Sequence, residues 1–281
     1  MNKINRVGIV IKPHAPNVVE VLNDLVSYLQ AQGKECVLEE AAAGKIGGQN
    51  GIPREMVPDE SGLIIVLGGD GTLLSIAHLA ARRSIPVMGV NLGRLGFLTE
   101  VPVDEMLLTL DAYFKGSREI TSRRRMLDVF YRDNIFLCLN DIVINKGALA
   151  RMIRCEIYIN DKRIAIPRLD GIIVSTPTGS TAYSLAAGGP IIQPNMPAVI
   201  FAPICPHTLT FRPMVISSDS EIRIKVITEG EKTFLTLDGQ RGNKMRKNDE
   251  VKIRISDHTL SLISSPKRNY FDLLHEKLGW G

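Results

Sequence analysis

A glycine-rich turn between a buried strand and a helix constrains this chain more than any other stretch. The apolar run LIIVL at residues 63–67 is typical of a strand buried on both faces. The turn GGDGT follows at residues 68–72, and residues 73–80 then carry apolar side chains at helical spacing. In an open parallel sheet, such a turn lies at the carboxyl edge of the strands, where ligands bind. The sequence therefore predicts a ligand site here.

The composition of this turn favours phosphate as the ligand. Glycines let the backbone approach a ligand closely, and successive N–H groups beside a helix N-terminus attract phosphate oxygens. Phosphates repel the carboxylate of Asp70, so this side chain needs a function of its own. Holding a metal ion or accepting a proton from a hydroxyl would each be such a function. The alternative is an ordinary tight turn in which Asp70 caps the following helix.

The first 120 residues alternate between strand and helix patterns. Strands are predicted at residues 7–11, 35–38, 63–67 and 85–90, and helices at residues 18–32, 73–80 and 102–114. Residues 41–58 are rich in glycine and proline and predict a mobile loop. This order favours a doubly wound, Rossmann-like α/β domain with a parallel sheet. A second glycine-containing loop, NLGRLGFL at residues 91–98, then follows the last of these strands and is expected to form a second wall of the ligand crevice.

The pattern changes near Thr121 to short alternating segments, which predict an all-β domain of the sandwich type. Strands are expected at residues 127–131, 135–144, 152–159, 171–174, 222–227, 233–237, 251–255 and 259–263. The amphipathic segment 270–280 predicts a helix that packs back on the first domain. We therefore expect an α/β domain at residues 1–120 plus 266–281, and a β-sandwich domain at residues 121–265.

Composition narrows the class of partner and the compartment. The formal net charge is +4 over 281 residues and aromatic residues make up 5%, which does not favour a nucleic-acid binder. No apolar run reaches membrane-spanning length, and the N-terminus lacks the apolar core of a signal peptide. The four cysteines are widely spaced, so we expect reduced core thiols rather than a metal site. These features predict a cytoplasmic protein that binds neither nucleic acid nor membranes.

Two further stretches carry polar chemistry. Asn140 and Asp141 interrupt an apolar strand, where an amide and a carboxylate are costly unless they have partners. They could read a nucleoside, or they could mark a kink or an exposed edge. The segment STPTGSTAY at residues 175–183 supplies hydroxyls suited to ribose, amide and phosphate groups, or to capping a helix. Arg151 and Arg168 could each meet a phosphate or form surface ion pairs.

Together these motifs resemble the ATP-dependent NAD kinase family of bacterial type. The resemblance is carried by GGDGT at 68–72, NLGRLGFL at 91–98, Asn140-Asp141, the block at residues 170–190 and the terminal segment 271–281. The glycine-aspartate turn alone is also found in phosphofructokinases and diacylglycerol-type lipid kinases. The block at residues 170–190 is the specific part.

The resemblance implies a role for each matching residue. Asp70 would accept the proton of the substrate hydroxyl, and the phosphates of ATP would lie at Gly68, Gly69, Gly71 and Thr72. The NAD site would comprise Asp70, Gly71, Asn140, Asp141, Arg151, Arg168, Asp170, Thr181, Ala182, Tyr183, Ser184, Leu185, Ala186 and Gln240. Many members of the family carry Glu at the position of Asp141. The residue at position 240 varies within the family, so the resemblance says least about the role of Gln240.

The implied reaction is ATP + NAD⁺ → ADP + NADP⁺, with phosphorylation of the 2′-hydroxyl of the adenosine ribose. A divalent ion, Mg²⁺ or another, would be held mainly by ATP, with no dedicated set of protein ligands. The family implies a homodimer or homotetramer. The alternatives are a lipid or sugar kinase that shares the glycine turn, or a non-enzymatic NADP-binding sensor on the same scaffold.

Overall fold

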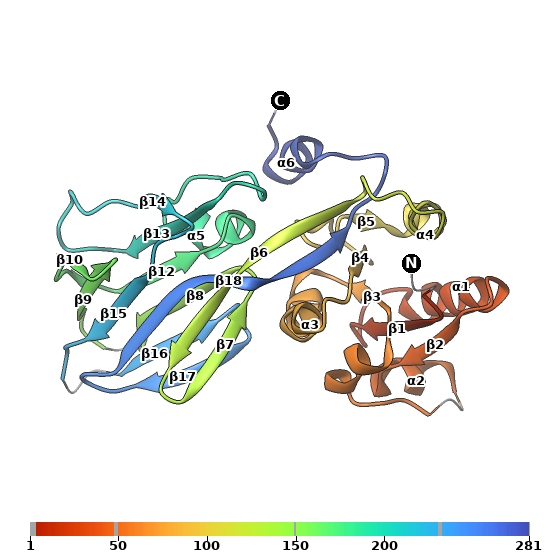
Figure 1. The fold of residues 1–281 in the computed structure, drawn as a ribbon, viewed down its shortest axis with the longest axis horizontal. Helices are drawn as coiled ribbons and strands as arrows, with labels where there is room; N and C mark the ends of the chain where they lie inside the picture. The colour runs from red at the N-terminus through yellow and green to blue at the C-terminus, as the bar shows by residue number, and fades with distance from the viewer. Residues whose placement is uncertain (1–3, 48–49, 149, 230–231, 281) are drawn as a thin grey trace. The chain divides into compact units, whose positions relative to one another are not determined.

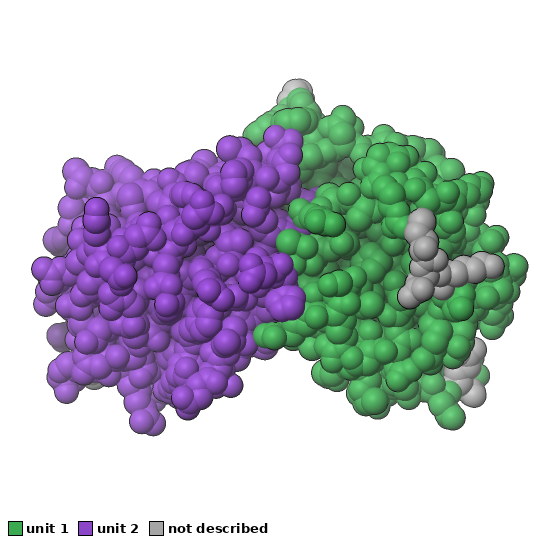
Figure 2. Space-filling model, in the orientation of Figure 1, with its two compact units in different colours: residues 1–123, 259–281 green, residues 124–258 purple. Residues whose placement is uncertain are grey.

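The computed structural model describes residues 4–47, 50–148, 150–229 and 232–280 (Figure 1). The chain divides into two compact units, residues 1–123 with 259–281 (unit 1) and residues 124–258 (unit 2), coloured separately in Figure 2. These boundaries lie a few residues from the boundaries at 120 and 265 that the sequence predicts. They fall inside two long strands, β6 (Thr121–Tyr131) and β18 (Glu250–Ile263).

Unit 1 is built on a parallel sheet in the order β2-β1-β3-β4. Its strands are β1 (Arg6–Ile11), β2 (Glu35–Leu38), β3 (Leu63–Gly68), β4 (Val87–Asn91) and the short β5 (Val101–Pro102). The end of β18 adds to β4 through Leu262 and Ile263. All six residues of β3 are buried, as expected for a central strand covered on both faces.

Helices cover both faces of this sheet. The described helices of unit 1 are α1 (Val18–Ala31), α2 (Glu40–Ile46), the 3₁₀ helix η1 (Arg54–Glu60), α3 (Asp70–Arg82) and α4 (Val103–Phe114), together with α6 (Tyr270–Leu278) near the C-terminus. Alternate strand residues such as Ile9 and Ile65 pack with α1 and α4 in one core, while α3 lies on the other face (Figure 1). None of the described helices combines the length and apolar character that crossing a bilayer requires.

The C-terminal segment belongs to unit 1, as the sequence predicts. Ser265 and Arg268, which precede α6, both contact the buried carboxylate of Glu105 on α4. Within α6, Asn269 and Asp272 form a reciprocal capping box, and the helix ends at Gly279 in the left-handed region.

Unit 2 consists of two antiparallel layers packed around one apolar core. One layer contains β7 (Asn134–Cys138), β9 (Ile153–Ile159), β10 (Lys162–Ala165), β11 (Arg168–Leu169) and β15 (Ile222–Val226), with β6 and β18. The other is a six-stranded sheet in the order β14 (Met214–Ser217), β13 (Ala198–Ile204), β12 (Gly171–Ser175), β8 (Asp141–Lys146), β16 (Thr233–Leu237) and β17 (Arg241–Met245). The short helices η2 (Thr178–Thr181) and α5 (Tyr183–Ala186) follow β12. The predicted α/β domain followed by a β-sandwich is confirmed.

Several local predictions were wrong. The described part of residues 41–58 contains α2 and η1 rather than a loop, because buried Ala42, Ala43 and Val57 anchor it to the sheet; residues 48–49 lie outside the described part. Segments 251–255 and 259–263 form the single strand β18, and segment 135–144 breaks into β7 and β8 at the Asn140 step. The cysteines are free, but Cys205 is exposed rather than in the core.

Candidate active site

The glycine-aspartate turn has the predicted strand–turn–helix structure. β3 ends at Gly68, Gly69 occupies the N-cap position in an extended conformation, and α3 begins at Asp70. A Cβ on Gly68 would lie 2.8 Å from Oγ1 of Thr72, which is why the chain needs glycine at this close approach. Because Gly69 and not Asp70 is the N-cap residue, the interpretation of Asp70 as the helix cap is wrong.

The carboxylate of Asp70 instead holds the loop that follows β4. Its Oδ2 accepts the backbone N–H of Phe97 at 2.9 Å, and its Oδ1 accepts the N–H groups of Leu98 at 3.1 Å and Thr99 at 2.9 Å. The hydroxyl of Thr99 donates a further hydrogen bond to Oδ1 at 2.9 Å. Because Oδ2 accepts only one of these four bonds, it retains capacity for a proton from a ligand. The two glycine loops therefore meet at Asp70.

The loop after β4 is also shaped from within. Oδ1 of Asn91 accepts the N–H of Gly93 at 2.6 Å, and its amide donates to the carbonyl of Arg94. The lysine ammonium of Lys277 on α6 lies 5.7 Å from the centre of the Phe97 ring. These contacts fix the loop before any ligand is bound.

A partly buried ion pair, which the sequence did not indicate, connects the glycine turn with the end of β1. Glu39 accepts the N–H of Ile11, the last residue of β1, at 2.6 Å and pairs with Nε of Arg54 at 2.6 Å. Arg54 also donates to Oγ of Ser75 at 2.8 Å, and Ser75 donates to the carbonyl of Thr72 at 2.7 Å. The end of β1 and the first turn of α3 are thus joined through one network.

In unit 2, the candidate residues converge at one end of the six-stranded sheet. Asp141 begins β8 and pairs with Ser175, the last residue of the antiparallel strand β12. Asp238 directly follows β16, whose last residue, Leu237, pairs with Ile142 of β8. Because β8 runs antiparallel to both β12 and β16, the start of β8 lies beside the ends of the other two strands. The polar residues at these three strand ends therefore lie together.

Asp238 is the residue that the sequence analysis missed. Its carboxylate accepts the backbone N–H groups of Leu139 at 2.9 Å, Asn140 at 2.7 Å and Asp141 at 3.2 Å. Asp238 and Gly239 both have positive φ, of 50° and 63°, which makes the turn that aims this carboxylate back at β8. The sequence did contain a signal for this residue: Asp238 is an acidic residue at the first position of a hairpin turn, directly after an apolar strand.

The hydroxyl-rich loop at residues 175–183 is hydrogen-bonded to the segment 139–140 that Asp238 also holds. Oγ1 of Thr176 donates to the carbonyl of Leu139 at 2.6 Å, and Oγ of Ser175 donates to the carbonyl of Asn140 at 3.1 Å. A Cβ on Gly179 would overlap that same carbonyl of Asn140, so only glycine fits. Ser180 accepts the N–H of Ile192 at 3.1 Å and closes the loop. Several of the predicted binding hydroxyls thus have structural partners.

Burial sets the electrostatics of this end of the sheet. Asp141 is 5% exposed, and burial together with the charge of Asp238 raises its pKa to about 7, against the opposing effect of the Tyr183 N–H, which donates to it. Burial also raises the pKa of Asp238, although its three N–H donors and Arg241 act in the opposite direction. A carboxyl group with a pKa near neutrality in a polar cluster is typical of a functional site.

Three buried polar atoms of this cluster lack hydrogen-bond partners among the described residues. They are Oδ1 of Asn140, Oγ1 of Thr178 and Oγ of Ser184. Buried polar atoms are normally paired, so three unpaired atoms in one cluster are unusual. The predicted residues Asn140 and Ser184 are among them.

The remaining predicted residues do not converge on Asp141. Asp170 precedes β12, so its backbone lies one five-residue strand, roughly 15 Å, from Ser175. Its carboxylate lies 3.7 Å from the ammonium of Lys146, and the exposed Arg168 lies on β11 nearby in sequence. Tyr183 and Ala186 line a cavity of about 260 Å³ with Ile204, whose carbonyl accepts the Asp170 N–H. The α5 segment thus extends from Asp141 toward the Asp170 end.

The outer members of the predicted site are open to solvent. The side chains of Arg151 and Gln240 are exposed, and Thr181, Ala182 and Leu185 are partly buried. The residues that the structure describes contain no group of three or more His, Cys, Asp or Glu placed to hold a metal ion. A divalent ion would therefore need other ligands, such as phosphate oxygens.

Comparison with known proteins identifies the family. Residues 7–118 match the ATP-NAD kinase N-terminal domain, and residues 139–265 match the ATP-NAD kinase C-terminal domain. The NAD kinase of Geobacter sulfurreducens is 42% identical over 282 aligned residues, and that of Trichlorobacter lovleyi is 44% identical over 284, each comparison covering 99% of both chains.

Solved structures agree with this comparison. The yeast NADH kinase complexed with NADH superimposes with a TM-score of 0.90 at 25% identity, covering 100% of this chain and 89% of that one. The NAD kinase from Archaeoglobus fulgidus in complex with ATP gives a TM-score of 0.80 at 26% identity, covering 98% of this chain and 100% of the other. The chain belongs to the ATP-NAD kinase family.

Proposed function

We propose that this protein transfers the terminal phosphoryl group of ATP to the 2′-hydroxyl of the adenosine ribose of NAD⁺, giving ADP and NADP⁺. The observation that carries the proposal is the carboxylate of Asp70, held by four hydrogen bonds at a glycine turn with one lone pair of Oδ2 left for a substrate hydroxyl. The full-length similarity to proteins named NAD kinase supports the choice of substrates.

Asp70 is the proposed general base. An alcohol is a weak nucleophile until its proton is accepted, and Oδ2 takes that proton as the bond from the ribose oxygen to phosphorus forms. The bond from phosphorus to the ADP oxygen breaks in line with it, and ADP leaves with the electron pair. The fixed loop at residues 97–99 holds the base in one orientation, so no reorganisation is needed at the moment of reaction.

The glycine turn supplies the phosphate contacts in this proposal. The backbone N–H groups of Gly69 and Gly71 at the start of α3 are the proposed donors to phosphate oxygens, without side-chain bulk, whereas the N–H of Thr72 donates to the carbonyl of Gly69 at 2.9 Å and leaves the Thr72 hydroxyl for a phosphate. Mg²⁺ or another divalent ion neutralises charge when it is bound to the ATP phosphates. We assign it no side-chain ligand, because no cluster of suitable side chains occurs among the described residues.

Unit 2 supplies the proposed recognition of NAD. Asn140 presents an unpaired amide oxygen for the adenine edge, and Asp141 accepts from ribose hydroxyls. The α5 segment and Asp170 extend the contact over roughly 15 Å, a length suited to two nucleosides joined by a pyrophosphate. Arg151, Arg168 and Gln240 complete the proposed set, together with Thr181 to Ala186.

We further propose a homodimer or homotetramer and a cytoplasmic location. The match of both halves of the chain to the ATP-NAD kinase domains supports the assembly that the family resemblance implies. The free thiols of all four cysteines suit a reducing compartment.

One assay tests the proposal against its rivals. The protein is incubated with ATP, Mg²⁺ and NAD⁺, and NADP⁺ is detected with an NADP-specific dehydrogenase. Formation of NADP⁺ is the expected result. A lipid or sugar kinase would form none but would consume ATP with another acceptor, and a non-enzymatic sensor would bind NADP⁺ without any turnover. Absence of NADP⁺ from well-folded protein contradicts the proposal.

A further inference from the structure

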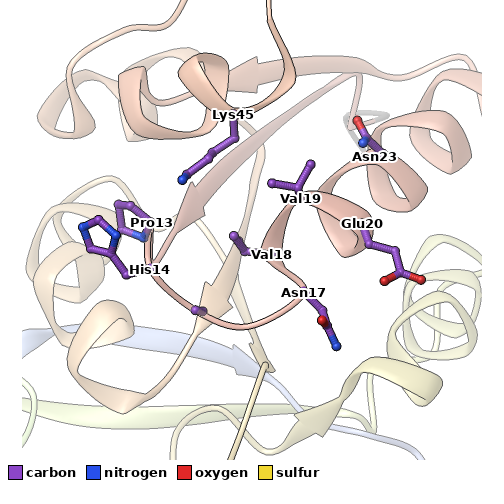
Figure 3. Close-up of a pocket in the computed structure, with 9 residues that line it drawn as sticks. Pro13, His14, Asn17, Val18, Val19, Glu20, Asn23 and Lys45 are labelled. Carbon is purple, nitrogen blue, oxygen red and sulfur yellow. The ribbon is translucent and has the colours of Figure 1, made fainter.

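Two features of unit 1 lie beside the proposed active site, and one of them has no role so far. The first is a cavity of about 630 Å³ at the β1–α1 loop, where Figure 3 shows Lys45 extending toward Pro13 and His14. It adjoins the glycine turn, because the N–H of Lys12 donates to the carbonyl of Leu67 at 2.8 Å, and it belongs to the donor side of the site already proposed. The second is the C-terminal helix α6, which the proposed function does not use.

Helix α6 is held firmly on unit 1. Its apolar side chains Leu273 and Leu274 are 1% and 3% exposed. Just before the helix, Nε of Arg268 lies 3.8 Å from the buried carboxylate of Glu105 on α4, and Arg268 also pairs with Glu276 on α6 at 2.6 Å. Burying a carboxylate is costly unless it is paired, so these ionic contacts keep α6 in place against α4. The helix can therefore act as a rigid support for the residues that its last turn contacts.

The last turn of α6 contacts the loop that holds Asp70. The ammonium of Lys277 lies 5.7 Å from the centre of the Phe97 ring, a distance at which a cation is attracted to an aromatic face. Lys277 is exposed, and its ammonium has no hydrogen-bond or ion-pair partner among the described residues. No ion pair within the described part of the chain therefore competes with the contact to Phe97.

Phe97 distinguishes the two oxygens of the Asp70 carboxylate. Oδ1 accepts three hydrogen bonds, from the N–H groups of Leu98 and Thr99 and from the Thr99 hydroxyl. Oδ2, the proposed proton acceptor, accepts one hydrogen bond from the described residues, the N–H of Phe97 at 2.9 Å. A movement of Phe97 would therefore change the orientation of Oδ2 while the bonds to Oδ1 remain.

Burial fixes the donors to Oδ1 more firmly than the donor to Oδ2. Leu98 and Thr99 are 2% and 0% exposed, whereas Phe97 is only half-buried and follows Gly96, which has no side chain to pack. Segments with few buried contacts are the first to move. The Phe97 N–H therefore needs a contact from outside the loop to stay aimed at Oδ2, and Lys277 supplies such a contact.

We propose that Lys277 is a positioning residue for the proposed base. Its ammonium restrains the Phe97 ring, and the Phe97 N–H in turn orients Oδ2 of Asp70 toward the ribose hydroxyl. This inference rests on the proposed function for the role of Asp70 as a base. It gives the C-terminal helix a part in catalysis that the glycine turn at residues 68–72 does not contain.

Lys277→Met removes the charge and keeps an unbranched side chain. The kcat for NADP⁺ formation should fall about 2–5-fold, the scale of one exposed cation–π contact expressed as a rate, and the KM values for NAD⁺ and ATP should not change. Lys277→Arg should retain the wild-type kcat, because a guanidinium is also attracted to the ring. Lys267→Met is the matched control: Lys267 is an exposed lysine just before α6, and it contacts no aromatic ring within the described part of the chain.

A double-mutant cycle shows whether Lys277 acts through Phe97. Phe97→Leu keeps the backbone N–H and an apolar side chain but removes the aromatic face, so it should lower kcat by a similar factor. Lys277→Met should then have no further effect in the Phe97→Leu background. Losses that multiply in the double variant would show that Lys277 does not act through this ring and would overturn the inference. Melting curves of all variants report folding.

Amide hydrogen exchange gives a readout that does not depend on turnover. The amide of Phe97 should exchange about 2–5-fold faster in Lys277→Met than in the wild type, whereas the amides of Leu98 and Thr99 should keep their rates. If the wild type forms no NADP⁺, the proposed function fails, and the exchange rates still test whether Lys277 holds Phe97. A folded Lys277→Met variant with wild-type kcat, or with exchange that rises equally at all three amides, overturns the inference.

Discussion

Gly96 stands against the carboxylate of Asp70 so closely that a Cβ at this position would overlap Oδ1 of Asp70 and crowd Oγ1 of Thr99. The loop after β4 can donate its N–H groups to Asp70 only because this residue has no side chain. We therefore expect Gly96→Ala to displace the proposed base and lower kcat by about 10²-fold, the scale of a lost general base. Steady-state NADP⁺ formation measures kcat, and NAD⁺ binding should persist.

Gly93→Ala is the control for this substitution. Gly93 lies in the same loop, and a Cβ there would meet nothing within 4 Å. Its kcat should remain within about twofold of the wild type, since surface substitutions of this kind have small effects. Equal activity of the two alanine variants would show that the packing of Gly96 against Asp70 does not matter for turnover.

Asp70→Asn removes the proposed base with little change in volume. Turnover should fall at least ~10²-fold while NAD⁺ still binds, because an amide cannot accept the ribose proton. An amide nitrogen in place of Oδ2 would also face the N–H of Phe97, so part of the loss could come from loop movement. Thr99→Val separates the two effects: it removes one hydrogen bond to Oδ1, keeps the base and should cost far less. Wild-type turnover by Asp70→Asn would exclude the assigned role.

Glu39 and Arg54 give a prediction about stability rather than catalysis. Glu39→Gln leaves Arg54 without its buried carboxylate, and because the Arg54 side chain is 29% exposed and partly solvated, the unfolding free energy should fall by about 1–2 kcal/mol, less than for a fully buried pair. Glu40→Gln, at the adjacent exposed position, should change the unfolding free energy by less than about 0.5 kcal/mol. Urea denaturation of both variants provides the comparison. Equal midpoints would mean that the pair contributes no net stability.

Local patterns in the sequence were sufficient to predict most of the fold. The buried run before Gly68, the helical spacing after it and the alternation beyond Thr121 each reflect which face of an element is covered. The α2–η1 region was missed because its anchors, such as Ala42 and Val57, are few and separated by glycine and proline. The single strand β18 was divided because the polar residues 256–258 interrupt its alternation.

The candidate site could be predicted only where its chemistry is contiguous in the sequence. The glycine turn can be recognised from five consecutive residues, 68–72. The hydrogen-bond partners of Asp70, in contrast, lie at residues 97–99 and cannot be read from that motif. Asp238 lies 97 positions or more from the N–H groups that it accepts, and Arg54 lies 21 positions from Ser75. Such pairings depend on strand order and register, which no local pattern specifies.

Asp238 should act as a positioning residue for NAD. Asp238→Asn removes a charge and one acceptor from the cluster that holds the Leu139–Asp141 backbone. The KM for NAD⁺ should rise about 10-fold, as for loss of a charge-assisted bond, with the KM for ATP unchanged. Asp161→Asn is the control, because Asp161 is also a turn residue with positive φ but is exposed to solvent. A KM for NAD⁺ equal to that of the wild type would contradict the positioning role.

The affinity for NAD⁺ should depend on the protonation of Asp141. Burial and the charge of Asp238 raise the pKa of Asp141 to about 7, and a ribose hydroxyl donates best to the ionised carboxylate. The affinity should therefore increase about tenfold between pH 6 and pH 8, as the ionised fraction rises. Titration of NAD⁺ by calorimetry across this range measures it. Asp141→Asn should abolish the dependence, and Asp238→Asn should move its midpoint to lower pH.

The stability of the ligand-free protein should change in the opposite direction. The pKa of Asp141 is higher in the folded protein than the ordinary value of 3.8, so the folded state binds this proton more tightly than the unfolded chain. Its contribution is complete below pH 4 and is lost as the pH rises through about 7. Asp141→Asn should therefore flatten the decrease in unfolding free energy between pH 4 and pH 7, measured by urea denaturation. A slope identical in wild type and Asp141→Asn would show that this carboxyl group does not titrate there, because its proton accounts for the expected difference.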